Sequence, residues 1–173
     1  LQECGIRIDV ADRVARIYGN TFKNPLNNLD CGNSGTTMRL MAGLLSGLKI
    51  KAKLTGDESL LKRPMDRIID PLTKMGVRIN SKDGVGPLAI YDFNLCPIDY
   101  SLDIESAQVK SSIIFAALGI KSGTSTIKGK INTRDHLEKM LNEINNECIS
   151  VTDNSILVNG GINLKAFEYD VPG

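Results

Sequence analysis

The sequence predicts an α/β fold of the α+β type, with helices packed beneath mixed sheets. Segments with the apolar spacing of helices alternate along the chain with short, often paired segments typical of strands. In addition, a helix start rich in small polar residues occurs twice, and Ser106 follows Ser34 by 72 residues. A repeat of this length indicates a duplicated unit within one fold, because solenoid repeats are shorter.

In the first half, small polar residues precede the first helix, and Asn33 or Ser34 can cap it. Pro64 suits the first position of the next helix, whose apolar stripe includes Ile68 and Leu72. The expected elements are strands at 6–10 and 14–17, a helix at about 36–46, a strand at 48–54 and a helix at 64–75.

The second half repeats the order helix, strand, helix, strand. Gly119 ends its first helix in register with Gly47, and Thr133 fits the cap of the last helix. The expected elements are strands at 77–79, 88–90 and 98–102, a helix at 107–120, a strand at 124–127, a helix at 134–145 and strands at 148–151, 156–158 and 167–171.

The first of the two helix starts has the composition of an anion site. Gly35 allows close approach to the main chain, and the free N–H groups of the first turn carry the positive end of the helix dipole. Arg39 adds a charge nearby. The same pattern also begins ordinary helices, but its recurrence at Ser106 favours ligand binding.

Composition indicates one globular domain. The chain has 173 residues, 42% of them hydrophobic, and a net charge of +1, which argues against disorder and against a general nucleic-acid binder. It contains no apolar run long enough for a membrane span and no visible signal peptide. Its four cysteines form no CxxC pair, which argues against a metal site and for a reduced, cytoplasmic setting.

Four motifs, at 33–40, 54–65, 106–111 and 133–140, resemble the 5-enolpyruvylshikimate-3-phosphate synthase family in order and spacing. The third motif reads SAQVKS and resembles a bacterial branch that includes glyphosate-tolerant members. The resemblance implies transfer of the enolpyruvyl group of phosphoenolpyruvate to the 5-hydroxyl of shikimate 3-phosphate, with release of phosphate. No metal or organic cofactor is implied. This is the shikimate-pathway step that leads to chorismate and aromatic amino acids, and it is the glyphosate target.

The resemblance also implies two lobes built from strand-helix-strand-helix-strand-strand units, with the site between them. Residues 1–173 would be most of the N-terminal lobe, without its first strand region and without the second lobe. The start at Leu1 and the turn-like end at Gly173 agree with a fragment. Such a fragment is expected to be inactive alone, and the parent enzyme to be a monomer.

The resemblance assigns substrate-binding residues position by position. Gly35 and Arg63 would contact phosphoenolpyruvate, and an alanine at Gly35 would accompany glyphosate tolerance, so the glycine predicts sensitivity there. The expected shikimate 3-phosphate contacts are Ser106, the backbone of Ala107, Gln108 and Arg134, and contact with phosphoenolpyruvate is a further possible role of Gln108. For Arg134, an ion pair with Asp135 or Glu138 is the alternative. Asn33, Thr36 and Arg39 are expected to shape the loop, Lys110 and His136 to be structural, and no catalytic residue is expected in this chain.

Two other functions stay open at this point. Cys31 suggests UDP-N-acetylglucosamine enolpyruvyl transferase as an alternative family, because that enzyme uses a cysteine near phosphoenolpyruvate. The surrounding motifs differ, however, and a buried cysteine at a strand end is the simpler interpretation. A non-catalytic module that binds a phosphorylated ligand is the second alternative.

Overall fold

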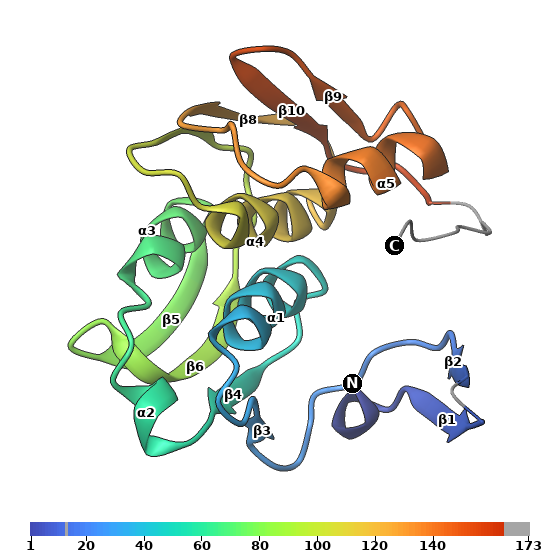
Figure 1. Ribbon diagram of the computed structural model, residues 1–173, viewed down its shortest axis with the longest axis vertical. Helices are drawn as coiled ribbons and strands as arrows, with labels where there is room; N and C mark the ends of the chain where they lie inside the picture. Colours follow the sequence, from blue (N-terminus) through green and yellow to red (C-terminus); the bar gives the residue numbers. More distant parts are fainter. Residues whose placement is uncertain (13, 165–173) are drawn as a thin grey trace.

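The computed structural model describes residues 1–12 and 14–164 (Figure 1). The expected strand at 167–171 and the chain end at Gly173 lie outside these residues. The first part contains η1 (Gln2–Cys4), β1 (Arg7–Ala11), β2 (Val14–Tyr18), β3 (Leu29–Asp30), α1 (Gly35–Gly47), β4 (Ala52–Thr55), α2 (Glu58–Leu61), α3 (Asp66–Lys74), β5 (Val77–Lys82) and β6 (Val85–Phe93). The second part contains β7 (Asp99–Leu102), α4 (Ala107–Leu118), β8 (Thr124–Gly129), α5 (His136–Ile144), β9 (Ile149–Val151) and β10 (Ser155–Asn159).

The described residues form two four-stranded sheets of identical topology, with strand orders β3-β4-β6-β5 and β7-β8-β10-β9. In each sheet the first pair is parallel, with Leu29 opposite Leu54 and Tyr100 opposite Ile127, and the other pairs are antiparallel. Each unit therefore runs strand-helix-strand-helix-strand-strand, with the short α2 added in the first. This confirms the predicted mixed α/β architecture and its duplication.

A hairpin formed by β1 and β2 precedes the two units. The stretch from Leu1 to Ile8 follows the pattern from Leu72 to Ile79, and the glycines Gly5 and Gly76 have left-handed φ values of 85° and 88°. The hairpin thus repeats the end of a unit. In the described part of the chain it pairs with no further strand, and several of its apolar side chains are exposed.

Helices α1 and α4 lie side by side between the two sheets (Figure 1). Their contact is backbone to backbone. A Cβ atom on Gly43 would overlap the Ser112 carbonyl, and one on Gly119 would overlap the backbone of Gly47. The register that the repeat suggested between Gly47 and Gly119 is therefore a physical contact.

One continuous core fills the space between sheets and helices. It takes Met38 and Leu45 from α1, Ile113 and Ile114 from α4, and Leu88 from β6. No helix in residues 1–12 and 14–164 has the length and apolar character needed to cross a membrane.

Two predicted helix starts are wrong. Pro64 forms a bridge with Val85 instead of opening α3, and the Met65 N–H donates to the Gly84 carbonyl, so this segment stays extended and α3 begins two residues later. Thr133 is no cap either. Its N–H donates to the Ile131 carbonyl in a tight turn, and α5 begins only after Asp135.

Strand ends also differ from the prediction. Residues 48–50 are not extended, because Lys49 has a φ of 57° and the N–H groups of Lys49 and Ile50 bond back to the end of α1. In contrast, β5 and β6 are longer than expected, because Asp83 and Gly84 form a two-residue turn with positive φ that joins them as a hairpin. The short elements β3 and α2 were not predicted.

The glycine contact between α1 and α4 yields a stability prediction. Alanine is the better helix former by roughly 1 kcal/mol, yet Gly43→Ala should lower the free energy of unfolding by about 1–3 kcal/mol, because the methyl group forces the helices apart. Gly19→Ala is the control, since no atom lies within 4 Å of the added Cβ. Urea denaturation measures both, and a Gly43→Ala chain as stable as the control would contradict the packing argument.

Candidate functional site

Helices α1 and α4 begin at the same edge of the molecule. Ser34 and Ser106 are their N-caps, and each side-chain oxygen accepts a hydrogen bond from the backbone N–H three residues later, at 3.1 Å and 3.3 Å. The first turns are joined by the 2.7 Å hydrogen bond from Gln108 to Thr36. Two positive helix ends therefore face the same space, an arrangement that favours an anion. Of the two caps the sequence allowed for α1, Ser34 is the one that forms.

Arg39 links the two helix starts to the segment before α3. Its Nη1 donates to Gln108 Oε1 at 2.7 Å, and its Nη2 donates to the Pro64 carbonyl at 3.0 Å. Because Gln108 is also held by Thr36, its amide has one orientation, with the oxygen on the arginine and the N–H on the hydroxyl. Arg39 and Thr36 thus fix a side chain of the other unit.

Arg63 is held by the residue that precedes the α1 cap. Its Nη2 donates to Asn33 Oδ1 at 2.6 Å, and Asn33 Nδ2 donates to Asp57 Oδ2 at 2.6 Å. The other oxygen of Asp57 caps α2 by accepting the Leu60 N–H. These hydrogen bonds, with Asn33 first, hold the pKa of Asp57 below its usual range.

Gly35 lies buried between these two arginines. A Cβ atom there would come within 2.9 Å of Arg39 Nη1 and 3.5 Å of Arg63 Nη1. The first contact involves the end of a flexible side chain, which could move away and lose its bond to Gln108. The absence of a side chain at Gly35 therefore leaves both guanidinium groups close to the start of α1.

The site is strongly cationic. Burial lowers the pKa of Arg39, and the charges of Arg63 and Arg67 lower it further. A hollow of about 310 Å³ is lined by Arg39, Pro64, Arg67, Ser106, Gln108 and Val109. Sequence reasoning missed Arg67, which lies in the first turn of α3, four residues after Arg63.

Arg134 stands apart from this cluster. It is exposed in the segment between β8 and α5 and makes no hydrogen bond or ion pair with the described residues. The alternative partners are already engaged, since Asp135 pairs with Lys139 at 3.1 Å and Glu138 pairs with Lys110. Ala107 is the first residue of α4, and Ser106 lines the hollow. The structure brings together the other predicted residues, Asn33, Gly35, Thr36, Arg39, Arg63 and Gln108, but does not join Arg134 to them.

Among the described residues, the arginine cluster, formed by Arg39, Arg63 and Arg67, makes no hydrogen bond with a cysteine or histidine side chain. Cys31 is buried just after β3, and burial raises the pKa of its thiol, as expected for a strand-end cysteine and not for a nucleophile. His136 is exposed at the start of α5. Within the part of the chain that the structure describes, no group of three or more His, Cys, Asp or Glu residues could hold a metal ion.

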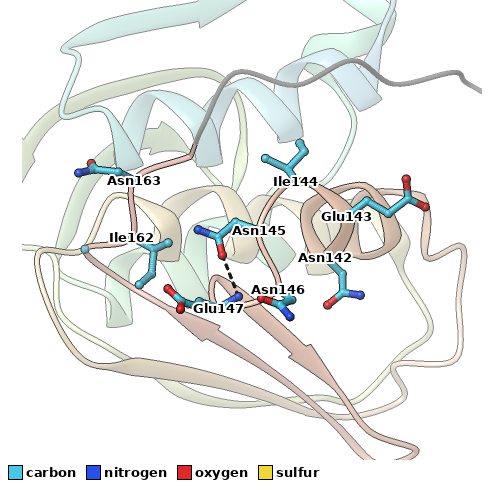
Figure 2. Close-up of a pocket in the computed structure, with 9 residues that line it drawn as sticks. Asn142, Glu143, Ile144, Asn145, Asn146, Glu147, Ile162 and Asn163 are labelled. Atoms are coloured by element: carbon cyan, nitrogen blue, oxygen red, sulfur yellow. Dashed lines mark hydrogen bonds between the residues drawn. The ribbon is translucent and has the colours of Figure 1, made fainter.

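A larger hollow, of about 690 Å³, lies elsewhere (Figure 2). It is formed by the end of α5 and the segment after β10, and its charged lining residues are Glu143 and Glu147. Because its described lining residues offer carboxylates and amides but no arginine or lysine, they are poorly suited to an anionic ligand. The smaller arginine-lined hollow is therefore the candidate site.

Comparison with known proteins shows which family this chain resembles. The family model described as EPSP synthase (3-phosphoshikimate 1-carboxyvinyltransferase) matches residues 1–173. Relatives named 3-phosphoshikimate 1-carboxyvinyltransferase include one from Ruthia magnifica, 46% identical over 175 residues, and one from Syntrophomonas wolfei, 44% identical over 178 residues. These alignments cover 99% and 100% of this chain but 40% and 41% of the relatives.

A solved structure supports the same relationship. The EPSP synthase from Acinetobacter baumannii superimposes with a TM-score of 0.85 at 36% sequence identity, covering 94% of this chain and 38% of that one. The chain therefore spans about two fifths of the length of the proteins it matches.

The hydrogen bonds that link Arg63, Asn33 and Asp57 yield a prediction on the pKa of Asp57. Asn33→Ala removes the hydrogen bond that contributes most to the low pKa of Asp57, so that pKa should rise toward its ordinary value. A carboxylate with a depressed folded pKa contributes stability above its unfolded pKa that is lost as the pH falls through the folded pKa. The variant should therefore lose less stability on acidification than the natural chain.

NMR titration of the aspartate carboxyl carbons measures this directly. Asp70 is the internal control, because its low pKa depends on Lys74 and should not change. An Asp57 that titrates identically in both proteins would contradict the role given to Asn33.

Proposed function

The chain belongs to the EPSP synthase family, and we propose that it forms part of a 3-phosphoshikimate 1-carboxyvinyltransferase. That enzyme transfers the enolpyruvyl group of phosphoenolpyruvate to the 5-hydroxyl of shikimate 3-phosphate and releases phosphate. The step belongs to the shikimate pathway, and the relatives are named after it. UDP-N-acetylglucosamine enolpyruvyl transferase is not supported, because the comparisons point to EPSP synthases and Cys31 is buried.

One structural observation carries the proposal: two helix starts and three arginines converge on one edge. Both substrates carry a phosphate group, and phosphoenolpyruvate also carries a carboxylate. Bringing them together requires fixed positive charge, because the anions repel one another. Guanidinium groups suit this task, since they stay protonated and bind phosphate or carboxylate through paired N–H donors.

We assign phosphoenolpyruvate to Gly35 and Arg63. The approach of the Arg63 guanidinium to the bare backbone of Gly35 supports this, because an anion between them would meet both N–H donors and charge. Asn33 acts on this subsite through Arg63, which it holds at 2.6 Å. Its role is thus to position a ligand residue.

We assign shikimate 3-phosphate to Ser106, the backbone of Ala107, Gln108 and Arg134. Ser106 and Gln108 line the cationic hollow at the start of α4, where hydroxyl and amide groups can contact phosphate and ring hydroxyls. Thr36 and Arg39 support this subsite by fixing the amide of Gln108.

Residues 1–173 form most of the N-terminal lobe in this proposal, and the rest of the enzyme supplies the acid and base groups. Protonation of the phosphoenolpyruvate methylene and removal of the hydroxyl proton both need such groups, and none of the residues assigned here has that role. The parent enzyme would be a cytoplasmic monomer that needs no cofactor.

Calorimetric titration of the chain with shikimate 3-phosphate tests the assignment. Arg134→Ala with Gln108→Ala should weaken binding by roughly 100-fold or more, because it removes two contacts to a charged group worth about 1.5 kcal/mol or more each. Shikimate, which lacks the phosphate, and Arg16→Ala on the exposed β2 strand are the controls. If the chain alone does not bind, the titration is repeated with the second lobe added, and failure there would reject the ligand.

A turnover assay tests the division between lobes. The chain alone should release no phosphate from phosphoenolpyruvate in the presence of shikimate 3-phosphate, and adding the complementary lobe of a relative should restore release. Phosphate release by the chain alone, above that of an Arg63→Ala variant, would show that the acid and base groups lie within these 173 residues.

A further inference from the structure

A buried ion pair joins the first turns of α4 and α5. Lys110 and Glu138 are 1% and 3% exposed, and Lys110 Nζ lies 2.6 Å from Glu138 Oε1. Lys110 lies four residues after the Ser106 cap, and Glu138 lies four residues after Arg134. The pair therefore connects the start of one proposed substrate-binding helix to the segment that carries the remaining proposed ligand.

Lys110 also holds that segment directly. Its Nζ donates to the Ile131 carbonyl at 3.2 Å, and the same carbonyl accepts the Thr133 N–H at 2.7 Å. One ammonium group thus fixes the tight turn that immediately precedes Arg134. Arg134 itself has no hydrogen-bond or ion-pair partner among the described residues, so its backbone position depends on this turn.

Stability alone does not account for the pair. A buried ion pair loses hydration energy on folding and can often be replaced by apolar side chains without loss. In addition, neither oxygen of Glu138 has a donor in hydrogen-bond geometry among the described residues, and Thr133 Oγ1 is likewise buried without a partner. An apolar pair would avoid the cost of burying the two charges, but it could not hold the Ile131 carbonyl.

We propose that Lys110 and Glu138 are positioning residues that set the 131–135 segment against the start of α4. Arg134 then approaches the shikimate 3-phosphate phosphate from one side while Ser106 and Gln108 approach from the other. This inference rests on the proposed function for its ligand, but the contacts of Lys110 with Glu138 and with the Ile131 carbonyl exist in the free chain.

Hydrogen exchange on the full 173-residue chain tests the geometry without any ligand. The variant Lys110→Met with Glu138→Leu keeps an apolar core and should unfold within a few degrees of the natural chain. Its Thr133 amide should exchange at least ten times faster, whereas the Thr37 amide at the α1 cap should not change. The control is Lys128→Met with Asp99→Leu, which removes an exposed ion pair of the same unit. It should change the exchange rate of neither the Thr133 amide nor the Thr37 amide.

Unchanged exchange at Thr133, or an equal rise at Thr37, would overturn the proposal. Glu138→Gln keeps the side-chain shape and replaces the double variant in the exchange experiment if the double variant does not fold. It should also raise exchange at Thr133 more than at Thr37. If both variants fail to fold, the pair is a general stabiliser and the proposal is wrong.

A binding measurement then connects the geometry to the ligand. With both lobes present, the double variant should bind shikimate 3-phosphate at least ten times more weakly but bind shikimate as before, which a general loss of structure would not produce. Equal weakening for both ligands would overturn the positioning role. If the natural protein binds neither, the proposed function fails, while the exchange result still decides whether the pair sets the segment.

Discussion

The close packing of α1 against α4 is the constraint on which the rest of the structure depends. Gly43, Gly47 and Gly119 let the two backbones touch, so the helices lie in register and begin at the same edge. Each sheet covers the outer side of one helix, and the two units meet through this helix pair (Figure 1). Separating the helices would therefore disrupt the core and move the two caps apart.

This packing explains why the charged residues gather as they do. Arg39 belongs to the first unit and Gln108 to the second, yet they share a hydrogen bond because their helix turns are adjacent. Three arginines near two positive helix ends repel one another. Burial lowers the pKa of Arg39 most, and the charges of Arg63 and Arg67 lower it further. An anionic ligand would relieve that repulsion, so the free site is arranged for binding. The same contacts supply rigidity, because most polar atoms of the cluster hold one another.

The predictions that failed share a physical cause. Pro64 and Thr133 both fit helix starts by local preference, but neither forms one. Pro64 is held extended by its bridge with Val85, which is distant along the chain, and Thr133 is held in a tight turn by its bond to the Ile131 carbonyl. Residues 48–50 have strand-forming composition, yet their N–H groups donate hydrogen bonds to carbonyl groups at the end of α1. Local propensities are small, about 1 kcal/mol per residue or less, and tertiary contacts override them readily.

The sequence by itself determined the mixed α/β class and the duplication, and it narrowed the α1 cap to Asn33 or Ser34, because these follow from local periodicity and from a motif that repeats. Only the tertiary structure decided which groups meet. It joined Asn33 to Arg63, brought Arg67 to the hollow, left Arg134 outside the cluster and buried Lys110 against Glu138. Such pairings depend on how two separate units pack, and a one-dimensional pattern carries no information on the distance between side chains from different units.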